Sequence, residues 1–207
     1  MKTKRLLPIL MILLLGLLGC ASSPEPRFYL LSPVAESAPL KCSDPDISVL
    51  PDLGTASLGI TAITLPEAVD RPQLVWREGT GGVRVDAHER WAGSLKDQIP
   101  RLLAENLSRL TGNAQIAAYP AVAAERAAYR LAIDVQQFSG YADGRVVVDA
   151  HWAWVPRRGE VVLQGREVAV RQVSATDDMT AWVMAYNQAL AAVSEAIVRA
   201  WEAQACR

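Results

Sequence analysis

Alternation of apolar and polar side chains predicts three strands in the second half of the chain. Apolar residues occupy every second position from Tyr129 to Val135, which is typical of a strand with one buried face. A hairpin signal at Asp143-Gly144 precedes a longer alternating run, Val146–Trp154. Arg158-Gly159 then turns the chain into a third run, Val161–Val173. Together these segments predict a three-stranded β-meander.

Shorter apolar runs predict further strands in the first half of the chain. The β-prone runs are Phe28–Leu31, Ile47–Leu50 and Leu58–Leu65. Two more segments, Gln73–Arg77 and Val83–Asp86, flank the sequence Gly79-Thr80-Gly81-Gly82 and predict a hairpin around it.

Helical spacing of apolar residues predicts a helix between the hairpin and the meander. Its apolar face runs from Leu95 to Leu110. Ser94 is the expected N-cap, and Gly112 is the expected left-handed stop at the other end. Pro100 lies inside this pattern and removes one backbone donor, so we expect either a kink there or a helix whose regular part starts nearby.

The last predicted element is also the longest helix. Its apolar face runs from Met179 to Trp201, and Thr176 or Asp177 is expected to cap it. The element order is thus strands, helix, strands, helix. This order predicts an α+β fold, in which two helices pack on one face of a mainly antiparallel sheet.

The first 19 residues have the features of a lipoprotein signal peptide. Three basic residues precede the apolar run Leu6–Leu18, which is too short to span a membrane. The run ends in Leu17-Leu18-Gly19-Cys20, which fits the bacterial lipobox. We therefore expect lipidation of Cys20 and cleavage before it, so that acyl chains hold the protein on a membrane. The alternative is a simple cleaved signal peptide with an incidental cysteine.

The mature chain then divides into a lipidated tether, 20–27, and one domain, 28–207. Ala21 rather than Asp follows Cys20, which favours the outer membrane, with the domain facing the periplasm of a Gram-negative cell. Cleavage removes three basic side chains from a formal charge of −1 and leaves −4. This balance argues against nucleic-acid binding, which needs a basic surface. The lipid alone is expected to contact the membrane.

Groups suited to catalysis or metal binding are few, since the chain has two His and three Cys. His88-Glu89 point to opposite faces if that segment is a strand, and His151 is expected on a solvent face two positions beyond Asp149. Asp177-Asp178 are expected to place charge at a helix start. A metal site needs at least three convergent ligands. We predict no catalytic, cofactor or metal site, and no enzyme activity.

Two cysteines remain once Cys20 is consumed by lipid. Cys42 and Cys206 can pair in an oxidising compartment. Their positions in the sequence do not decide whether they come within bridging distance, so a disulfide and two free thiols both stay open.

An ordered set of segments resembles the ABC-type transport auxiliary lipoproteins. The most specific part is Leu65-Pro66 followed by Asp70-Arg71-Pro72-Gln73. The other segments, after the lipobox, are 28–31, 58–64, 90–92, 103–107 and 188–197. The match covers nearly the whole mature chain.

The resemblance implies a non-enzymatic part in lipid transport between the two membranes of the envelope. The implied partners are an MCE-domain protein, which forms a periplasmic tunnel, and a permease component of the inner membrane. The lipoprotein would receive the tunnel at the outer membrane as a homo-oligomeric ring. Candidate rim loops are Gly79–Gly82, Asp143-Gly144 and Arg157-Arg158-Gly159. One alternative is an envelope assembly or activator lipoprotein, for instance for peptidoglycan synthesis, and a weaker one is a periplasmic hydrolase.

Overall fold

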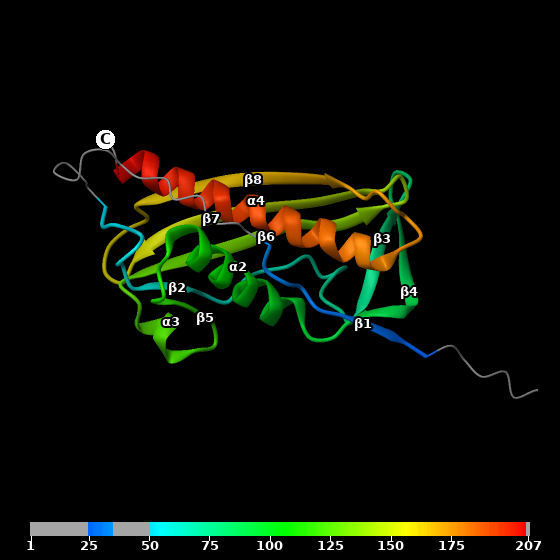
Figure 1. Cartoon of the computed structure of the whole chain (residues 1–207), viewed down its shortest axis with the longest axis horizontal. Helices are drawn as coiled ribbons and strands as arrows, with labels where there is room; N and C mark the ends of the chain where they lie inside the picture. The colour runs from blue at the N-terminus through cyan, green and yellow to red at the C-terminus, as the bar shows by residue number, and fades with distance from the viewer. Residues whose placement is uncertain (1–24, 35–49, 206–207) are drawn as a thin grey trace, which may run out of the picture.

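A computed structural model describes residues 25–34 and 50–205 of the chain (Figure 1). The strands are β1 (Arg27–Tyr29), β2 (Leu58–Ile60), β3 (Gln73–Glu78), β4 (Gly82–Trp91), β5 (Ile116–Ala118), β6 (Tyr129–Tyr141), β7 (Arg145–Pro156) and β8 (Leu163–Gln172). The helices are α2 (Leu95–Thr111), α3 (Val122–Arg126) and α4 (Met179–Ala205). The predicted hairpin and the predicted meander are confirmed as β3–β4 and β6–β7–β8.

Strand β6 is the centre of one sheet of eight strands. Along one edge it pairs with β7, and β7 pairs with β8. Along the other edge it pairs in parallel with β2 near its start and with β3 near its end. β5 lies beyond β2, while β4 and then β1 lie beyond β3. The α+β class is confirmed, but the sheet is mixed, since four of the seven pairings between described strands are parallel.

Of the predicted strand Leu58–Leu65, only the first three residues form a strand. The next contact of this segment with the sheet is a single parallel bridge between Thr64 and Asp134. All three residues of β2 are buried. Full burial of both faces is typical of strands in parallel pairings.

Helices α2 and α4 lie side by side on one face of the sheet, as predicted (Figure 1). Both predicted limits of α2 are confirmed: the Ser94 hydroxyl accepts a hydrogen bond from the Lys96 amide at 3.1 Å, and Gly112 has φ +69°. Pro100 is tolerated within the first turns of this helix. Its ring leaves the Lys96 carbonyl without a helical donor, and the helix nevertheless continues from Leu95 to Thr111.

The predicted cap of α4 is wrong by one or two residues. The Asp178 carboxylate, rather than Thr176 or Asp177, accepts a hydrogen bond from the backbone amide of Thr180 at 2.8 Å. The Thr176 carbonyl instead accepts the indole N–H of Trp182 at 3.0 Å, which fixes the loop before the helix. The side chain next to the helix start therefore takes the capping role.

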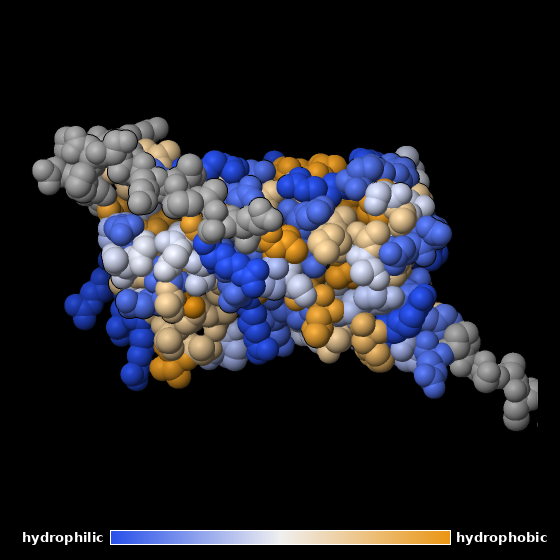
Figure 2. All heavy atoms as spheres, viewed as in Figure 1, coloured by the Kyte–Doolittle hydropathy of each residue, from blue (hydrophilic) through white to orange (hydrophobic). Residues whose placement is uncertain are grey.

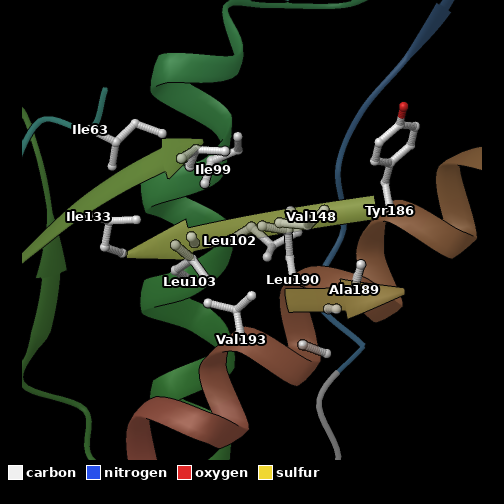
Figure 3. Packing of buried hydrophobic residues seen from close by; sticks show 14 of the residues in the cluster. Ile63, Ile99, Leu102, Leu103, Ile133, Val148, Tyr186, Ala189, Leu190 and Val193 are labelled. Atoms are coloured by element: carbon white, nitrogen blue, oxygen red, sulfur yellow. The ribbon is translucent and has the colours of Figure 1, made fainter. Parts of the chain in front are cut away.

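The main core lies between the sheet and the two long helices. In Figure 3, Ala189, Leu190 and Val193 of α4 face Val148 of β7, and Leu103 of α2 lies beside them; all five are buried. Aromatic pairs extend this core in both directions along α4. They are Trp76 with Trp182, Phe138 with Tyr186, and Trp154 with Trp201, at centroid distances of 4.3, 4.3 and 5.0 Å.

The short helix α3 covers the opposite face of the sheet, at β2. Leu58 and Ile60 point into the main core, so Gly59 between them points the other way. A Cβ atom on Gly59 would lie 2.2 Å from the backbone carbonyl oxygen of Ala124 in α3. Glycine is therefore required for this close approach. The sequence pattern predicts neither α3 nor β5.

Candidate interaction surface

The two residues of the His88-Glu89 pair point in different directions in the structure. Glu89 is buried and its carboxylate forms an ion pair with the Arg27 guanidinium. His88 is partly exposed, and its backbone amide donates to the Asp86 carboxylate at 2.9 Å. The two side chains do not share a site, which is consistent with a structural role for Glu89.

Asp149 is also committed to an ion pair. Arg166 donates to both of its carboxylate oxygens, at 2.9 and 2.7 Å. These hydrogen bonds lower the pKa of Asp149 even though its burial acts in the opposite direction. His151 is exposed on the same open face. The charged groups thus form a cross-strand pairing on the solvent side of β7 and β8, as surface strands commonly do.

The open face of the sheet is hollowed beside these groups. The hollow has a volume of about 810 Å³ and is widely open to solvent. Its lining combines small side chains with polar ones: Ala62, Ala132, Ala153, Thr64, Asp134, His151, Gln164 and Arg166. The Thr64 hydroxyl donates to the Asp134 carboxylate, and the Gln136 side chain donates to the other oxygen of that group. This hollow can accommodate a polar surface of a partner, but its acidic group is already satisfied.

Among residues 25–34 and 50–205, no three His, Cys, Asp or Glu side chains converge as metal ligands would. No helix in these ranges is both long enough and apolar enough to cross a bilayer. The candidate lipidation site Cys20 and the candidate disulfide residues Cys42 and Cys206 lie outside the described residues.

The three predicted rim loops do not lie at one end of the molecule. β3 runs parallel to β6 with Trp76 opposite Gly140, so the loop Gly79–Gly82 lies at the same end as Asp143-Gly144. Arg157-Arg158-Gly159 follows β7, which is antiparallel to β6, and lies at the other end (Figure 1). The expectation that all three loops form one rim is therefore wrong. The sequence alone carried no signal of this register.

The end that carries Arg157–Gly159 also exposes apolar side chains. Tyr119 and Val122 are exposed where β5 leads into α3, and Val161 and Val162 are exposed in the β7–β8 loop. The Arg157 amide donates to the Ala128 carbonyl at 2.8 Å, which ties this loop to the chain just after α3. We call these four apolar residues the α3-end surface. These residues were not predicted from the sequence, because isolated apolar residues in loops follow no periodic pattern.

The described part of the face covered by α2 and α4 is more mixed in polarity than the α3-end surface. Figure 2 shows hydrophilic and hydrophobic atoms intermixed over α2 and α4. Charged residues along the helices form pairs one turn apart, such as Arg109 with Glu105 at 3.0 Å. Pairs of this kind stabilise a solvated helix face only slightly. They do not form a site of their own.

Comparison with known proteins gives a family and a fold. A family model described as an ABC-type transport auxiliary lipoprotein component matches residues 39–198. No curated protein sequence matches this chain closely enough to count as a relative. A crystal structure titled only as an uncharacterized protein has 18% identity and a TM-score of 0.64, over 85% of this chain and 98% of its own.

Two further solved structures resemble this chain to different degrees. A Xanthomonas campestris protein assigned to the family DUF330 has 20% identity and a TM-score of 0.64, over 84% of this chain and 94% of its own. A PelC dodecamer from Paraburkholderia phytofirmans has 14% identity and a TM-score of 0.41, over 79% of this chain and 92% of its own. At these identities the likeness to the first two structures shows a shared fold.

Proposed function

The chain belongs to the family of ABC-type transport auxiliary lipoprotein components, and from this premise we propose that it is a non-enzymatic adaptor of an MCE-type lipid transport system. In this role, lipid on Cys20 anchors it to the outer membrane, facing the periplasm. The domain then binds the MCE-domain protein, which connects to a permease component in the inner membrane. The alternative is an envelope assembly or activator lipoprotein, which would use the same anchor with a different partner.

The observation that carries this proposal is the placement of β1 and the α3-end surface in different parts of the molecule. In Figure 1 the chain enters the domain at β1, while α3 and the β7–β8 loop lie at the far end of the sheet. An anchor attached before β1 leaves the α3-end surface free to meet a periplasmic partner. Exposed apolar side chains at such a surface suit protein binding. On the open face, by contrast, Asp149 is engaged in an ion pair and Asp134 in hydrogen bonds.

The anchor is tested by replacing its sulfur. Cys20→Ser should abolish fatty-acid labelling and leave the precursor unprocessed or released from the outer membrane, because stable anchoring depends on acyl chains. Labelling with a fatty-acid analogue, followed by membrane fractionation, measures both effects. If the variant still labels and still fractionates with the outer membrane, the lipidation site is elsewhere.

The partner is tested by affinity purification of the intact lipoprotein from membranes. We expect an MCE-domain protein to co-purify, and the double variant Val122→Asp with Val161→Asp to lose most of it. Val168→Asp is the matched control, because Val168 is equally apolar and exposed but lies on the open face of β8. Loss in the control alone would move the binding surface to the open face. Capture of a penicillin-binding protein in place of the MCE protein would favour the activator alternative.

A homo-oligomeric ring is part of the same proposal. Subunits in a ring meet through two different patches, joined head to tail. The sheet has unlike outer strands, β8 on one side and the short strands β1 and β5 on the other, which supply two such patches. Light scattering on the Ser22–Arg207 domain should give several times the monomer mass. A monomer at tens of micromolar that ignores the MCE protein would contradict both parts of the proposal.

A further inference from the structure

The N-terminal strand segment carries apolar side chains on both of its faces. Tyr29 and Leu31 point inward and pack against the hydrophobic core. Phe28 and Leu30 alternate with them, and each is 60% exposed. A surface strand in water normally alternates apolar and polar residues, with the polar ones outside. We call Phe28 and Leu30 the outer pair. Packing of the core does not account for apolar side chains at these two exposed positions.

An ion pair and a backbone hydrogen bond hold β1 on the sheet. Arg27 binds Glu89, its register partner on β4, whose side chain is only 7% exposed. The Tyr29 carbonyl accepts a hydrogen bond from the Ala92 amide at 2.8 Å. A buried carboxylate left without its partner is costly, so this ion pair opposes detachment of the strand.

Side chains from both long helices hold the residues that follow. The Leu31 amide donates to Gln98 of α2 at 2.9 Å, and the Ser32 amide donates to Asn187 of α4 at 3.0 Å. Backbone on either side of the outer pair is therefore fixed. The outer pair presents its apolar groups in one constant direction, unlike side chains on a loose tether.

The position of the outer pair in the sequence places it close to the expected lipid anchor. Arg27 follows Cys20 by only seven positions, with six residues between them. A chain of this length spans at most about 25 Å, at roughly 3.3–3.6 Å per residue. The outer pair is thus held within reach of the surface of the bilayer that receives the acyl chains.

One basic side chain shares the face of the outer pair, and a second lies at its edge on the opposite face. Arg90 is the cross-strand partner of Phe28 and shares its face of the sheet. The Arg27 side chain is 69% exposed despite its ion pair. Apolar groups with flanking arginines match the interface of a phospholipid leaflet, where phosphates lie above acyl chains.

We propose that the outer pair inserts into the phospholipid leaflet that carries the lipid anchor, with Arg90 at the level of the phosphates. This inference rests on the proposed lipid anchor at Cys20. It goes beyond the expectation that the lipid alone contacts the membrane. Its consequence is orientation: β1 faces the bilayer, and the α3-end surface faces the periplasm.

The test uses the intact, acylated lipoprotein in vesicles of phosphatidylethanolamine and phosphatidylglycerol. Cys42→Ser and Cys206→Ser remove the competing thiols, and Phe28→Cys or Leu30→Cys then carries an environment-sensitive fluorophore. Val168→Cys provides the matched control, a valine 48% exposed on the open face of the sheet. Phospholipids that bear a spin label near the headgroup should quench the fluorophore at positions 28 and 30 several-fold more than at position 168.

The possible outcomes separate the inference from the function on which it rests. Equal quenching at all three positions, in protein whose acylation is verified by mass, would overturn membrane insertion and leave the anchor intact. A fluorophore at 28 that is shielded without lipid quenching, and is released on dilution, would mean that a second copy covers the outer pair. Protein that carries no acyl chain would overturn the anchor and the inference together.

Discussion

Leu190 offers the most direct test of how α4 is held on the sheet. Its side chain is 1% exposed and faces Val148 of β7 and Leu103 of α2 (Figure 3). Leu190→Ala removes three carbon groups from this contact. At about 0.8 kcal/mol per buried methylene, the transfer of these groups alone accounts for about 2.4 kcal/mol. The unfilled cavity adds to this, so we expect the free energy of unfolding to fall by about 2–5 kcal/mol.

The neighbours of Leu190 favour the upper part of this range. Val148, Leu103 and Val193 belong to a strand and two long helices that many other contacts hold in place. Elements held in this way close only partly over a cavity, and the cost rises with the volume that remains. For a domain of this length, a loss of this size lowers the Tm by roughly 5–15 °C.

The assay is urea unfolding of the Ser22–Arg207 domain, followed by tryptophan fluorescence. Met184→Ala is the matched control, because Met184 lies on the same helix and is 45% exposed. This control should change the free energy of unfolding by less than about 0.5 kcal/mol. A Leu190→Ala variant with the stability of the wild type would refute the assignment of this face to the core. The face would then be a candidate surface for a partner or a second copy.

Two further predictions test the other face of the sheet. Gly59→Ala should lower the free energy of unfolding by about 1–3 kcal/mol, since its new methyl group meets the Ala124 backbone, whereas Gly81→Ala has nothing within 4 Å and should be nearly neutral by thermal melting. Asp149 has a pKa lowered below its ordinary value of 3.8 by Arg166, so its ion pair stabilises the fold above that value and is lost as the pH falls through the folded pKa. Asp149→Asn should therefore flatten the decrease in stability below about pH 4; equal slopes in urea titrations of the two proteins would contradict this.

Local signals accounted for the elements whose limits are decided within a few residues. The predicted helix from Leu95 to Leu110 is confirmed because its cap, Ser94, and its stop, Gly112, act on neighbouring backbone groups. The hairpin β3–β4 and the meander are confirmed for the same reason, since their turns join strands adjacent in sequence. Such features depend little on the rest of the chain.

Long-range partners account for what the sequence did not reveal. The three residues of β2 pair with β6 about 70 positions later and with β5. A strand of three residues is too short to show a periodic pattern from which these partners could be predicted. The limit of α4 shows the same effect at small scale: Thr176, Asp177 and Asp178 are all chemically fit to cap a helix. In the structure Asp178 takes the cap, while the Thr176 carbonyl accepts the indole N–H of Trp182 from within the helix.

The same distinction between local signals and long-range partners applies to the candidate site. The composition, and the lack of residues spaced as metal ligands, favoured a protein that acts by binding partners through its surface. The family resemblance added a role in transport. The direction of each strand decides which loops lie at the same end of the sheet. The sequence does not show the direction of β3 relative to β6. Its parallel pairing with β6 brings Gly79–Gly82 next to Asp143-Gly144 and leaves Arg157–Gly159 at the other end.

The length of the central strands determines how firmly the two ends of the sheet are held relative to each other. β6 has 13 residues and pairs with β7 from Tyr129 to Gly140, so the two ends of the sheet are joined by a ladder about 40 Å long, with one register shift between Val135 and Gln137. α4 packs along one face of β7 and β8 and reinforces the ladder across this shift. If the outer pair fixes β1 on the bilayer, the α3-end surface is held in one orientation relative to the membrane. An adaptor needs this property to align a tunnel, and a flexible lipid tether by itself does not provide it.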